Sequence, residues 1–280
     1  MGTPIQQLLD LSGQVALVTG GSRGLGLQIA ESLGEAGAKL MLTARKAHEL
    51  EAAVAHLSQR GIDARWIAAD ASRPDEVQRV CAETLERLGR VDILVNNAGA
   101  AWGAPAEEHS LEAWDKVMNL NIRSIFLMSQ QIGKRSMIPR KHGRIINIAS
   151  FAGLAGAPNI MTYGVAKAGV VTLSEQLRAE LTHKGIAVSV VCPSFFKTNL
   201  LENWAEGGQR MKAFAQRLMD TAKESADDIA AAIIAQSERG KFLVLPTRAE
   251  RLRWRLKRFL PEVYFRQVLK MARERGKAGH

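Results

Sequence analysis

The chain has 280 residues, of which 46% are hydrophobic and 24% charged, so it is long enough to bury a substantial core. No run of about 18 apolar residues occurs, and the first residues lack a basic region followed by a long apolar stretch, so we expect neither a membrane-spanning helix nor a secretory leader. The net charge of +10 comes from residues 239–280, which contain 13 Lys or Arg and 3 acids, whereas residues 1–238 contain 25 of each.

The first element is a strand followed by a glycine-rich turn and a helix. The apolar run 15–18 stops at the sequence Thr-Gly-Gly-Ser-Arg-Gly-Leu-Gly, and an amphipathic stretch over 25–33 follows at once. Gly20 can turn the chain with a positive φ, Gly24 lets the backbone approach a ligand, and Gly26 allows close packing of helix on strand. The N–H groups at the helix start would face a pyrophosphate. A plain tight turn is the alternative, and the preceding strand favours nucleotide binding.

Strands and helices then alternate along the chain. We predict strands at 39–44, 64–69, 92–95, 144–149, 186–191 and 242–245. We predict one helix that follows Arg45 and ends at about residue 60, and further helices over 74–88 and 111–137, around Tyr163 and Lys167, and from about 227. This alternation predicts an α/β fold of the Rossmann-like type: one doubly wound parallel sheet with right-handed crossovers, in a single domain over 1–247. Ligands gather at the carboxyl ends of such strands, where Gly20, Arg45, Asp70, Asn97, Ser150 and Pro193 all lie.

Residues 195–226 form a long, strongly apolar segment between a strand and the next helix. Met211, Phe214 and Leu218 fall on one helical face, which is consistent with a substrate lid over a pocket. Simple packing of the segment onto the body explains the same pattern equally well.

Residues 248–280 form a basic extension with helical spacing of its apolar residues. Leu252, Leu256, Phe259 and Val263 follow this spacing, and Pro261 either kinks the helix or starts another. A basic amphipathic helix with aromatic residues can lie on an anionic membrane surface. It can equally pack on a neighbouring subunit or cover the mouth of the active site. Nucleic acid is not an expected partner, since no recognised binding module accompanies the charge.

Several motifs together resemble those of the short-chain dehydrogenase/reductase family over about residues 10–246. They are Thr19-Gly20-x-x-x-Gly24-x-Gly26, Asn96-Asn97-Ala98-Gly99, Asn121, Ser150, Tyr163-x-x-x-Lys167 and the segment from Pro193 to Thr198, in the family's order and approximate spacing. The resemblance implies an NAD(P)-dependent enzyme that interconverts a ketone or aldehyde and its alcohol. It also implies a homodimer or homotetramer. We expect no metal, because the cysteines and the six histidines show no metal-ligand spacing. The two cysteines, Cys81 and Cys192, suit reduced thiols in the cytoplasm.

The resemblance implies catalytic roles for four residues. Tyr163 and Lys167 are four apart in a helical segment and so share a face. Tyr163 would be the general acid in ketone reduction and the base in the reverse reaction, with its phenolate favoured by the neighbouring ammonium and the oxidised nicotinamide. Lys167 would also bind the nicotinamide ribose, and Ser150 would donate to the substrate carbonyl oxygen.

The fourth catalytic residue is an asparagine that would hold a proton-relay water near Lys167. Asn119 and Asn121 both lie in the right region of the chain. We choose Asn121 because it follows Trp114 by seven residues, which is the family's usual spacing.

For the cofactor, we expect NADP(H) over NAD(H). Ala44 stands where NAD-binding folds carry an acid, Arg45 follows it, and Arg23 lies in the glycine loop, so two guanidinium groups can clamp a 2′-phosphate. Two solvated surface arginines are the alternative. Asp70 would accept from the adenine amine, and residues 97–99 would line the adenosine side. The implied cofactor-binding set is Gly20, Ser22, Arg23, Gly24, Leu25, Gly26, Arg45, Asp70, Ala71, Asn97, Ala98, Gly99, Tyr163, Lys167, Pro193, Ser194 and Thr198.

The apolar residues of 195–226 favour a hydrophobic carbonyl substrate, such as a lipid-like or 3-oxoacyl compound. The opening Leu9-Asp10-Leu11-Ser12-Gly13 also resembles sugar-acid reductases of the gluconate 5-dehydrogenase type, which makes a polar substrate the second choice. A cofactor-binding regulator or membrane-associated scaffold is a third possibility. Two departures from the family pattern stand out: Ser194 replaces a glycine and Ala166 replaces a serine.

Overall fold

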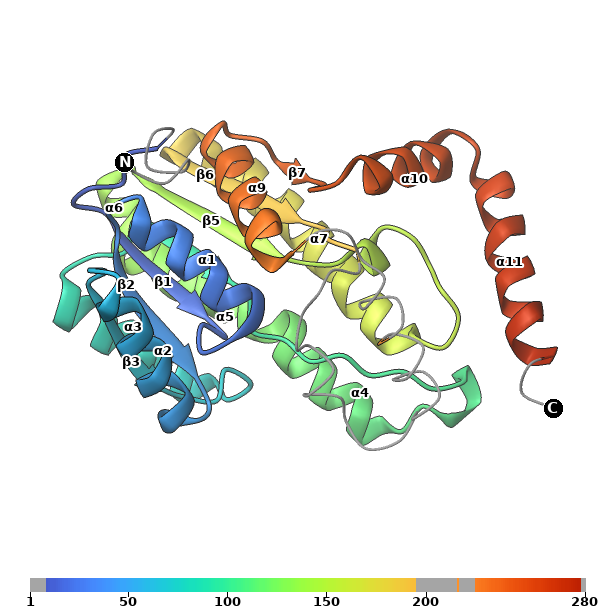
Figure 1. Cartoon of the computed structure of the whole chain (residues 1–280), viewed down its shortest axis with the longest axis horizontal. Coiled ribbons are helices and arrows are strands. Elements are labelled where there is room, and N and C mark those ends of the chain that lie inside the picture. Colours follow the sequence, from blue (N-terminus) through green and yellow to red (C-terminus); the bar gives the residue numbers. More distant parts are fainter. Residues whose placement is uncertain (1–8, 195–215, 217–224, 278–280) are drawn as a thin grey trace.

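A central parallel sheet organises the chain. In the computed structural model, which describes residues 9–194, 216 and 225–277, the strand order is β3-β2-β1-β4-β5-β6-β7 (Figure 1). The strands of this seven-stranded sheet are β1 (Val15–Thr19), β2 (Lys39–Ala44), β3 (Ala64–Ala68), β4 (Ile93–Asn96), β5 (Gly143–Ile148), β6 (Ile186–Val191) and β7 (Leu243–Val244). Each neighbouring pair is parallel, so the carboxyl ends of the strands share one edge of the sheet.

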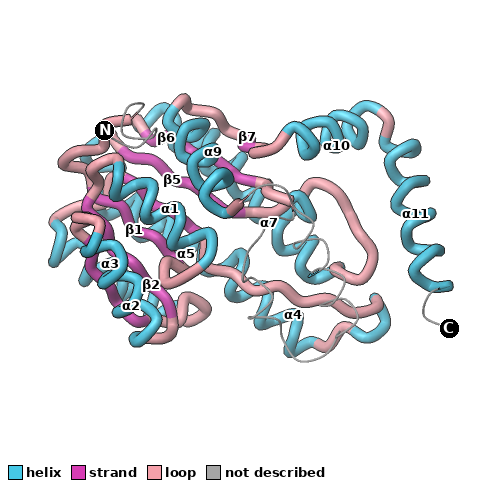
Figure 2. Tube along the Cα trace, in the orientation of Figure 1, coloured by secondary structure: helices cyan, strands magenta, loops and turns pink. Residues whose placement is uncertain are grey.

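Helices cover both faces of the sheet (Figure 2). The α-helices are α1 (Gly24–Glu35), α2 (Ala47–Gln59), α3 (Pro74–Leu88), α4 (Leu111–Met118), α5 (Ser124–Ile132), α6 (Ile138–Arg140), α7 (Met161–Leu181), α9 (Ala226–Glu238), α10 (Arg248–Phe259) and α11 (Pro261–Lys277). Short 3₁₀ turns lie at η1 (Ala106–Glu108), η4 (Phe151–Gly153) and η5 (Thr182–Lys184). Two π-helical turns, η2 (Asn119–Arg123) and η3 (Gly133–Met137), flank α5.

The strands are continuous apolar runs because both of their faces are buried. In β1, Ala16 and Val18 join one core cluster with residues of α1, α2 and α9. Leu17, between them, points to the opposite face and joins a second cluster with residues of α3, α5 and α7. The molecule is therefore a three-layer α/β sandwich, which confirms the predicted fold class.

The predicted elements match the observed ones to within a few residues, with one difference in kind. The stretch predicted as a single helical region over 111–137 contains α4 and α5 separated by the π turn η2, and it ends in the π turn η3. A π turn closes its hydrogen bonds over five residues instead of four, and it has no compositional signature in the sequence. This difference matters because η2 carries Asn121.

The carboxyl-terminal extension forms two helices that run beyond β7, away from the central sheet (Figure 1). Thr247 and Glu250 form a capping box that starts α10. Pro261 starts a second helix, α11, which was one of the two predicted alternatives, the other being a kink in a single helix. Trp254 and Tyr264 pack against a third core cluster. No helix in the described residues is long and apolar enough to cross a bilayer.

Candidate active site

The turn between β1 and α1 has the geometry of a phosphate-binding loop. Gly20 and Gly24 adopt φ values of +64° and +54°, which residues with a Cβ rarely adopt. A Cβ built on Gly26 would lie 2.1 Å from the Gly20 carbonyl oxygen, so only glycine allows this close approach. The N-cap residue of α1 is Arg23, whose side chain makes no capping hydrogen bond to the first N–H groups of the helix. The loop therefore fits the pyrophosphate of a dinucleotide.

A web of hydrogen bonds holds the ends of β1 and β4 together beside this loop. The backbone N–H groups of Asn97 and Ala98 both donate to Thr19 Oγ1 at 3.0 Å. The Asn97 amide donates in turn to the Thr19 and Gly20 carbonyl oxygens at 3.1 Å. The strand order reverses between β1 and β4, which is where doubly wound folds bind their ligands.

The region expected to receive a 2′-phosphate holds a carboxylate that sequence position did not indicate. Glu49 of α2 lies 3.8 Å from the Arg23 guanidinium and 2.9 Å from the Lys46 ammonium, and Ser22 donates to it at 3.3 Å. The hydrogen bond from Lys46 lowers the pKa of Glu49, so the side chain is an anion at neutral pH. Arg45 is exposed next to this group.

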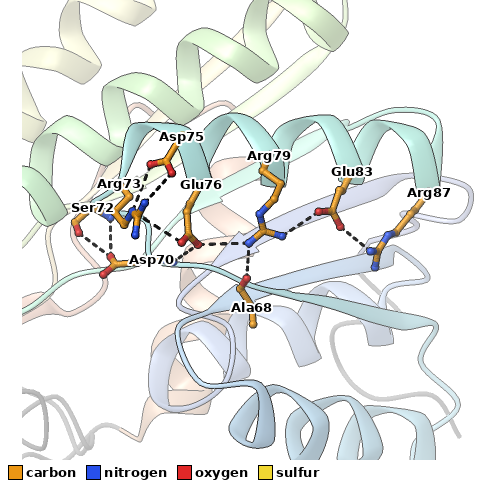
Figure 3. Close-up of polar contacts among 9 residues, drawn as sticks. All are labelled: Ala68, Asp70, Ser72, Arg73, Asp75, Glu76, Arg79, Glu83 and Arg87. Carbon is orange, nitrogen blue, oxygen red and sulfur yellow. Dashed lines mark hydrogen bonds and ion pairs between the residues drawn. The ribbon is translucent and has the colours of Figure 1, made fainter.

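Asp70 lies at the predicted place, just after β3, where it also organises the start of α3 (Figure 3). Its Oδ1 accepts hydrogen bonds from the Ser72 backbone N–H and the Ser72 hydroxyl, at 2.9 and 2.7 Å. Its own backbone N–H donates to Glu76 at 3.0 Å. Asp70 and the adjoining Ala71 are both partly buried.

Along α3, arginines cover the exposed edge of β3 (Figure 3). Arg79 donates to the Ala68 carbonyl oxygen at 2.7 Å, and Arg87 donates to the Trp66 carbonyl oxygen at 3.5 Å. These side chains also line a cavity of about 570 Å³ on this edge of the sheet. None of the residues that line the cavity belongs to the predicted site, so the cavity plays no part in it.

Asn121 is fully buried and is held by both of its polar atoms. Its Oδ1 accepts from the Ala100 backbone N–H, and its Nδ2 donates to the Ala100 carbonyl oxygen, both at 2.8 Å. A Cβ built on Gly99 would lie 3.0 Å from Asn121 Oδ1 and 3.5 Å from Lys167 Nζ, which places both side chains around this glycine. Asn119 instead accepts a hydrogen bond from Arg123 on the outer side of the turn, at 3.4 Å. The structure thus brings Asn121, and not Asn119, next to Lys167.

Lys167, which is buried, and Tyr163, which is partly buried, lie close together on α7. The Lys167 ammonium donates to the Ile148 carbonyl oxygen at 2.9 Å and lies 5.8 Å from the centre of the Tyr163 ring. Burial lowers the pKa of Lys167 to about 8. Burial also raises the pKa of Tyr163, while a hydrogen bond with Ser150 acts in the opposite direction. Burial thus disfavours the charged form of both groups, the phenolate of Tyr163 and the ammonium of Lys167.

Ser150 sits at the end of β5 and joins the ends of two strands. Its Oγ accepts from the Ala152 backbone N–H at 3.2 Å, which starts the turn η4. Phe151 N–H donates to the Pro193 carbonyl oxygen at 2.8 Å, so the turn is tied to the end of β6. Cys192 lies beside it, and burial raises the pKa of its thiol to about 12. Both cysteines are free and buried, which confirms that they form no disulfide.

The segment after β6 contains a contact that sequence reasoning missed. The Ser194 backbone N–H donates to Glu250 Oε1 at 2.6 Å, and Glu250 is only 2% exposed although it belongs to the basic extension. The Thr-x-x-Glu pattern at 247–250 signals a helix start, but nothing in it indicates contact with Ser194. Thr198 and almost all of the predicted lid over 195–226 lie outside the described residues.

A buried polar ladder beneath the site was also missed. Asn96 donates to Ser129 and Asn147 at 3.1 and 2.8 Å, and Asn147 donates to Ser174 at 2.9 Å. The ladder crosses from β4 to β5 and on to α7, the helix that carries Tyr163 and Lys167. Asn147 reads as part of an apolar strand in sequence, so only its pairing with Asn96 in register reveals the ladder.

Comparisons with known proteins agree with this arrangement. The short chain dehydrogenase family model matches residues 14–209. The chain is 38% identical to a 3-oxoacyl-[acyl-carrier-protein] reductase of Synechocystis sp. over 194 residues, which cover 69% of this chain and 78% of that protein. It is 35% identical to gluconate 5-dehydrogenase of Gluconobacter oxydans over 195 residues, with coverage of 70% and 76%.

Among solved structures, a short chain dehydrogenase/reductase of Burkholderia phymatum in complex with NAD superimposes with a TM-score of 0.85 at 26% identity. The match covers 91% of this chain and 96% of that chain. The family match ends at residue 209, so α10 and α11 lie beyond it. The chain therefore belongs to the short-chain dehydrogenase/reductase family, whose members are NAD(P)-dependent oxidoreductases that act on CH–OH groups.

Proposed function

We propose that this protein is an NADPH-dependent carbonyl reductase that also catalyses the reverse oxidation of the alcohol. The observation that carries the proposal is the convergence of Asn121, Ser150, Tyr163 and Lys167 at the carboxyl ends of β4 and β5. The nicotinamide cofactor supplies the hydride in reduction and accepts it in oxidation.

The protein's own residues handle the proton and the carbonyl oxygen. Tyr163, kept neutral by its raised pKa, donates its phenolic proton to the oxygen that becomes the alcohol. Ser150 donates a hydrogen bond to the same oxygen and stabilises the charge that develops on it. Lys167, whose ammonium form dominates below pH about 8, favours the resulting phenolate and binds the nicotinamide ribose. Asn121 orients the backbone of Ala100 beside Lys167, and the family resemblance assigns it the relay water.

For the cofactor we propose NADPH, with Arg23 and Arg45 facing the 2′-phosphate. The absence of an acid at the end of β2 supports this choice, since Ala44 stands there. The Glu49 carboxylate opposes the binding of a 2′-phosphate, because it is negatively charged and already pairs with Arg23 and Lys46. When NADPH is bound, Arg23 and Lys46 would exchange the Glu49 carboxylate for the 2′-phosphate as their partner.

For the substrate we propose an apolar or 3-oxoacyl-like carbonyl compound. The similarity to a 3-oxoacyl-[acyl-carrier-protein] reductase supports this class, as does the apolar composition of residues 195–226. The similarity to gluconate 5-dehydrogenase favours a keto-sugar acid as the second candidate. We further propose a cytoplasmic homodimer or homotetramer, and the exposed Phe126 of α5 and Val165 of α7 offer apolar surface for subunit contact.

The test is a side-by-side measurement of NADPH and NADH oxidation with long-chain 3-oxoacyl thioesters, apolar ketones and keto-sugar acids. Tyr163→Phe keeps the ring and removes the proton donor, so we expect turnover to fall about 100-fold or more while NADPH binding is retained. Turnover only with a sugar acid keeps the mechanism and rejects the apolar substrate. Retained NADPH binding without turnover of any compound favours a cofactor-binding regulator over an enzyme.

A further inference from the structure

Helix α10 has two opposite faces, and only one of them contacts the rest of the molecule. Glu250, Trp254 and Lys257 follow one another at helical spacing and point to the body. Glu250 bonds Ser194, Trp254 joins the core cluster around Phe151, and Lys257 donates to the Leu154 carbonyl oxygen. These three contacts fix the orientation of the helix about its own axis.

The opposite face of α10 is apolar and points to solvent. Leu252, Leu256 and Phe259 repeat the same spacing about half a turn away, and Leu252 and Phe259 are 63% and 73% exposed. Helix α11 continues the pattern: Tyr264 and Val268 are shielded, whereas Phe265 and Leu269 are exposed. Of the ten large apolar residues that the described chain leaves exposed, six lie between Leu252 and Leu269.

Cations flank this apolar surface. Arg253, Arg255, Arg258, Arg266 and Lys270 are all exposed on α10 and α11. Arg258 lies over the Trp254 ring at 5.8 Å, but none of the five forms an ion pair with another described residue, and Glu250 already accepts from the backbone N–H groups of Ser194 and Thr247. The partner of this surface must therefore bring negative charge as well as apolar contact.

We propose that the exposed faces of α10 and α11 bind an anionic phospholipid surface. Apolar side chains enter the boundary between headgroups and acyl chains, while arginine and lysine reach the lipid phosphates. A second copy of the chain fits less well, because pairing two extensions brings like charges together and residues 1–238 carry no net negative charge. The proposal concerns binding alone and does not depend on the proposed reaction.

The test is flotation of the full chain with two kinds of vesicle, phosphatidylcholine alone and phosphatidylcholine mixed with phosphatidylglycerol. At about 0.1 M salt we expect the protein to float with the anionic vesicles and to remain behind with the neutral ones, and added salt should weaken binding. A variant with Phe259→Ser, Phe265→Ser and Leu269→Ser should bind at least about tenfold more weakly.

A control is Leu111→Ser, which removes an apolar side chain that is 80% exposed at the start of α4 and should float like the wild type. The three substituted residues are exposed, so far-ultraviolet circular dichroism should show an unchanged fold. Equal flotation of the triple variant and the wild type overturns the proposal. Failure of the wild type to float with anionic vesicles also overturns it. A smaller oligomer of the triple variant in light scattering would overturn it as well, because that result assigns the surface to subunit contact.

Discussion

Tyr163 and Lys167 show how burial sets the chemistry of a site before any ligand binds. A phenol and an ammonium that share a buried helix face each shift toward the neutral form, because removal from water penalises charge. For reduction this suits Tyr163, which must arrive protonated. It leaves Lys167 as the group that titrates near physiological pH.

The reduction rate should therefore fall on the alkaline side because of Lys167. Below pH about 8 its ammonium is present, and above that value it is lost, while Tyr163 remains protonated because its pKa is raised above the usual 10.0. We expect kcat/KM for NADPH, which reports the free enzyme, to decline about tenfold per pH unit above this point. Steady-state kinetics across the alkaline range measure it. A flat profile up to pH about 10 would contradict the assignment to Lys167.

Glu49 supplies a second prediction at the scale of single residues. Replacing its carboxylate with the amide in Glu49→Gln removes the negative charge beside Arg23 and Lys46. We expect KM for NADPH to fall about two- to fivefold, since exposed ion pairs of this kind are worth up to about 1 kcal/mol. KM for NADH should change little. Glu51→Gln, on the exposed side of α2, is the control. A loss of NADH binding instead would make Glu49 a ribose ligand.

Among the elements, α10 belongs to the extension whose partner the sequence left open, and it contacts the site through Ser194. Its capping box and apolar spacing are legible in the sequence, so its existence was predictable. The contact of α10 with the site was not predictable, since the sequence around Glu250 does not indicate which backbone N–H its carboxylate will bind. The same holds for the π turn at Asn121. The family's spacing from Trp114 indicates the residue, but only the structure shows the widened turn that orients its side chain.

Glu250→Gln should loosen the Ser194 segment. Glutamine keeps one acceptor oxygen, so either the Ser194 or the Thr247 N–H loses its partner, which costs about 1–3 kcal/mol of unfolding free energy. We also expect KM for NADPH to rise several-fold at temperatures well below the unfolding transition, with a smaller change in kcat. Kinetics and thermal unfolding of this variant should be compared with Glu262→Gln, an exposed acid in the first turn of α11. Unchanged kinetics would restrict Glu250 to helix capping.

At the scale of the whole molecule, the sheet was the most predictable part. Buried strands and amphipathic helices follow directly from apolar periodicity, and parallel pairing with right-handed crossovers leaves few topologies to choose from. Gly20 and Gly26 were likewise readable, because their backbone geometry excludes other residues. Contacts between distant segments were not, as the Asn96–Asn147 ladder and Glu49 beside Ser22 illustrate.

Cofactor binding should stabilise the entire fold, since the proposed site takes residues from the ends of six strands, β1 to β6, and from helices α1 and α7. At NADPH concentrations about 100 times Kd, linkage predicts about 2.7 kcal/mol of added stability, which raises Tm by about 5 °C or more. Gly26→Ala places a Cβ against the Gly20 carbonyl oxygen and should abolish this rise. Differential scanning fluorimetry with and without NADPH tests both. An equal rise in the variant would mean that the cofactor binds elsewhere.

The π turn η2 also makes the chain sensitive to a change of length. A π turn arises when one residue is inserted into an α-helix, and the helix beyond it keeps its register. Deletion of a single residue within 119–123 would therefore restore an ordinary helix and leave the buried face of α5, with Ile125 and Met128, where it is. The fold would survive such a deletion, but Asn121 would rotate away from Ala100. One codon thus separates this protein from a stable chain in which Asn121 no longer bonds to Ala100.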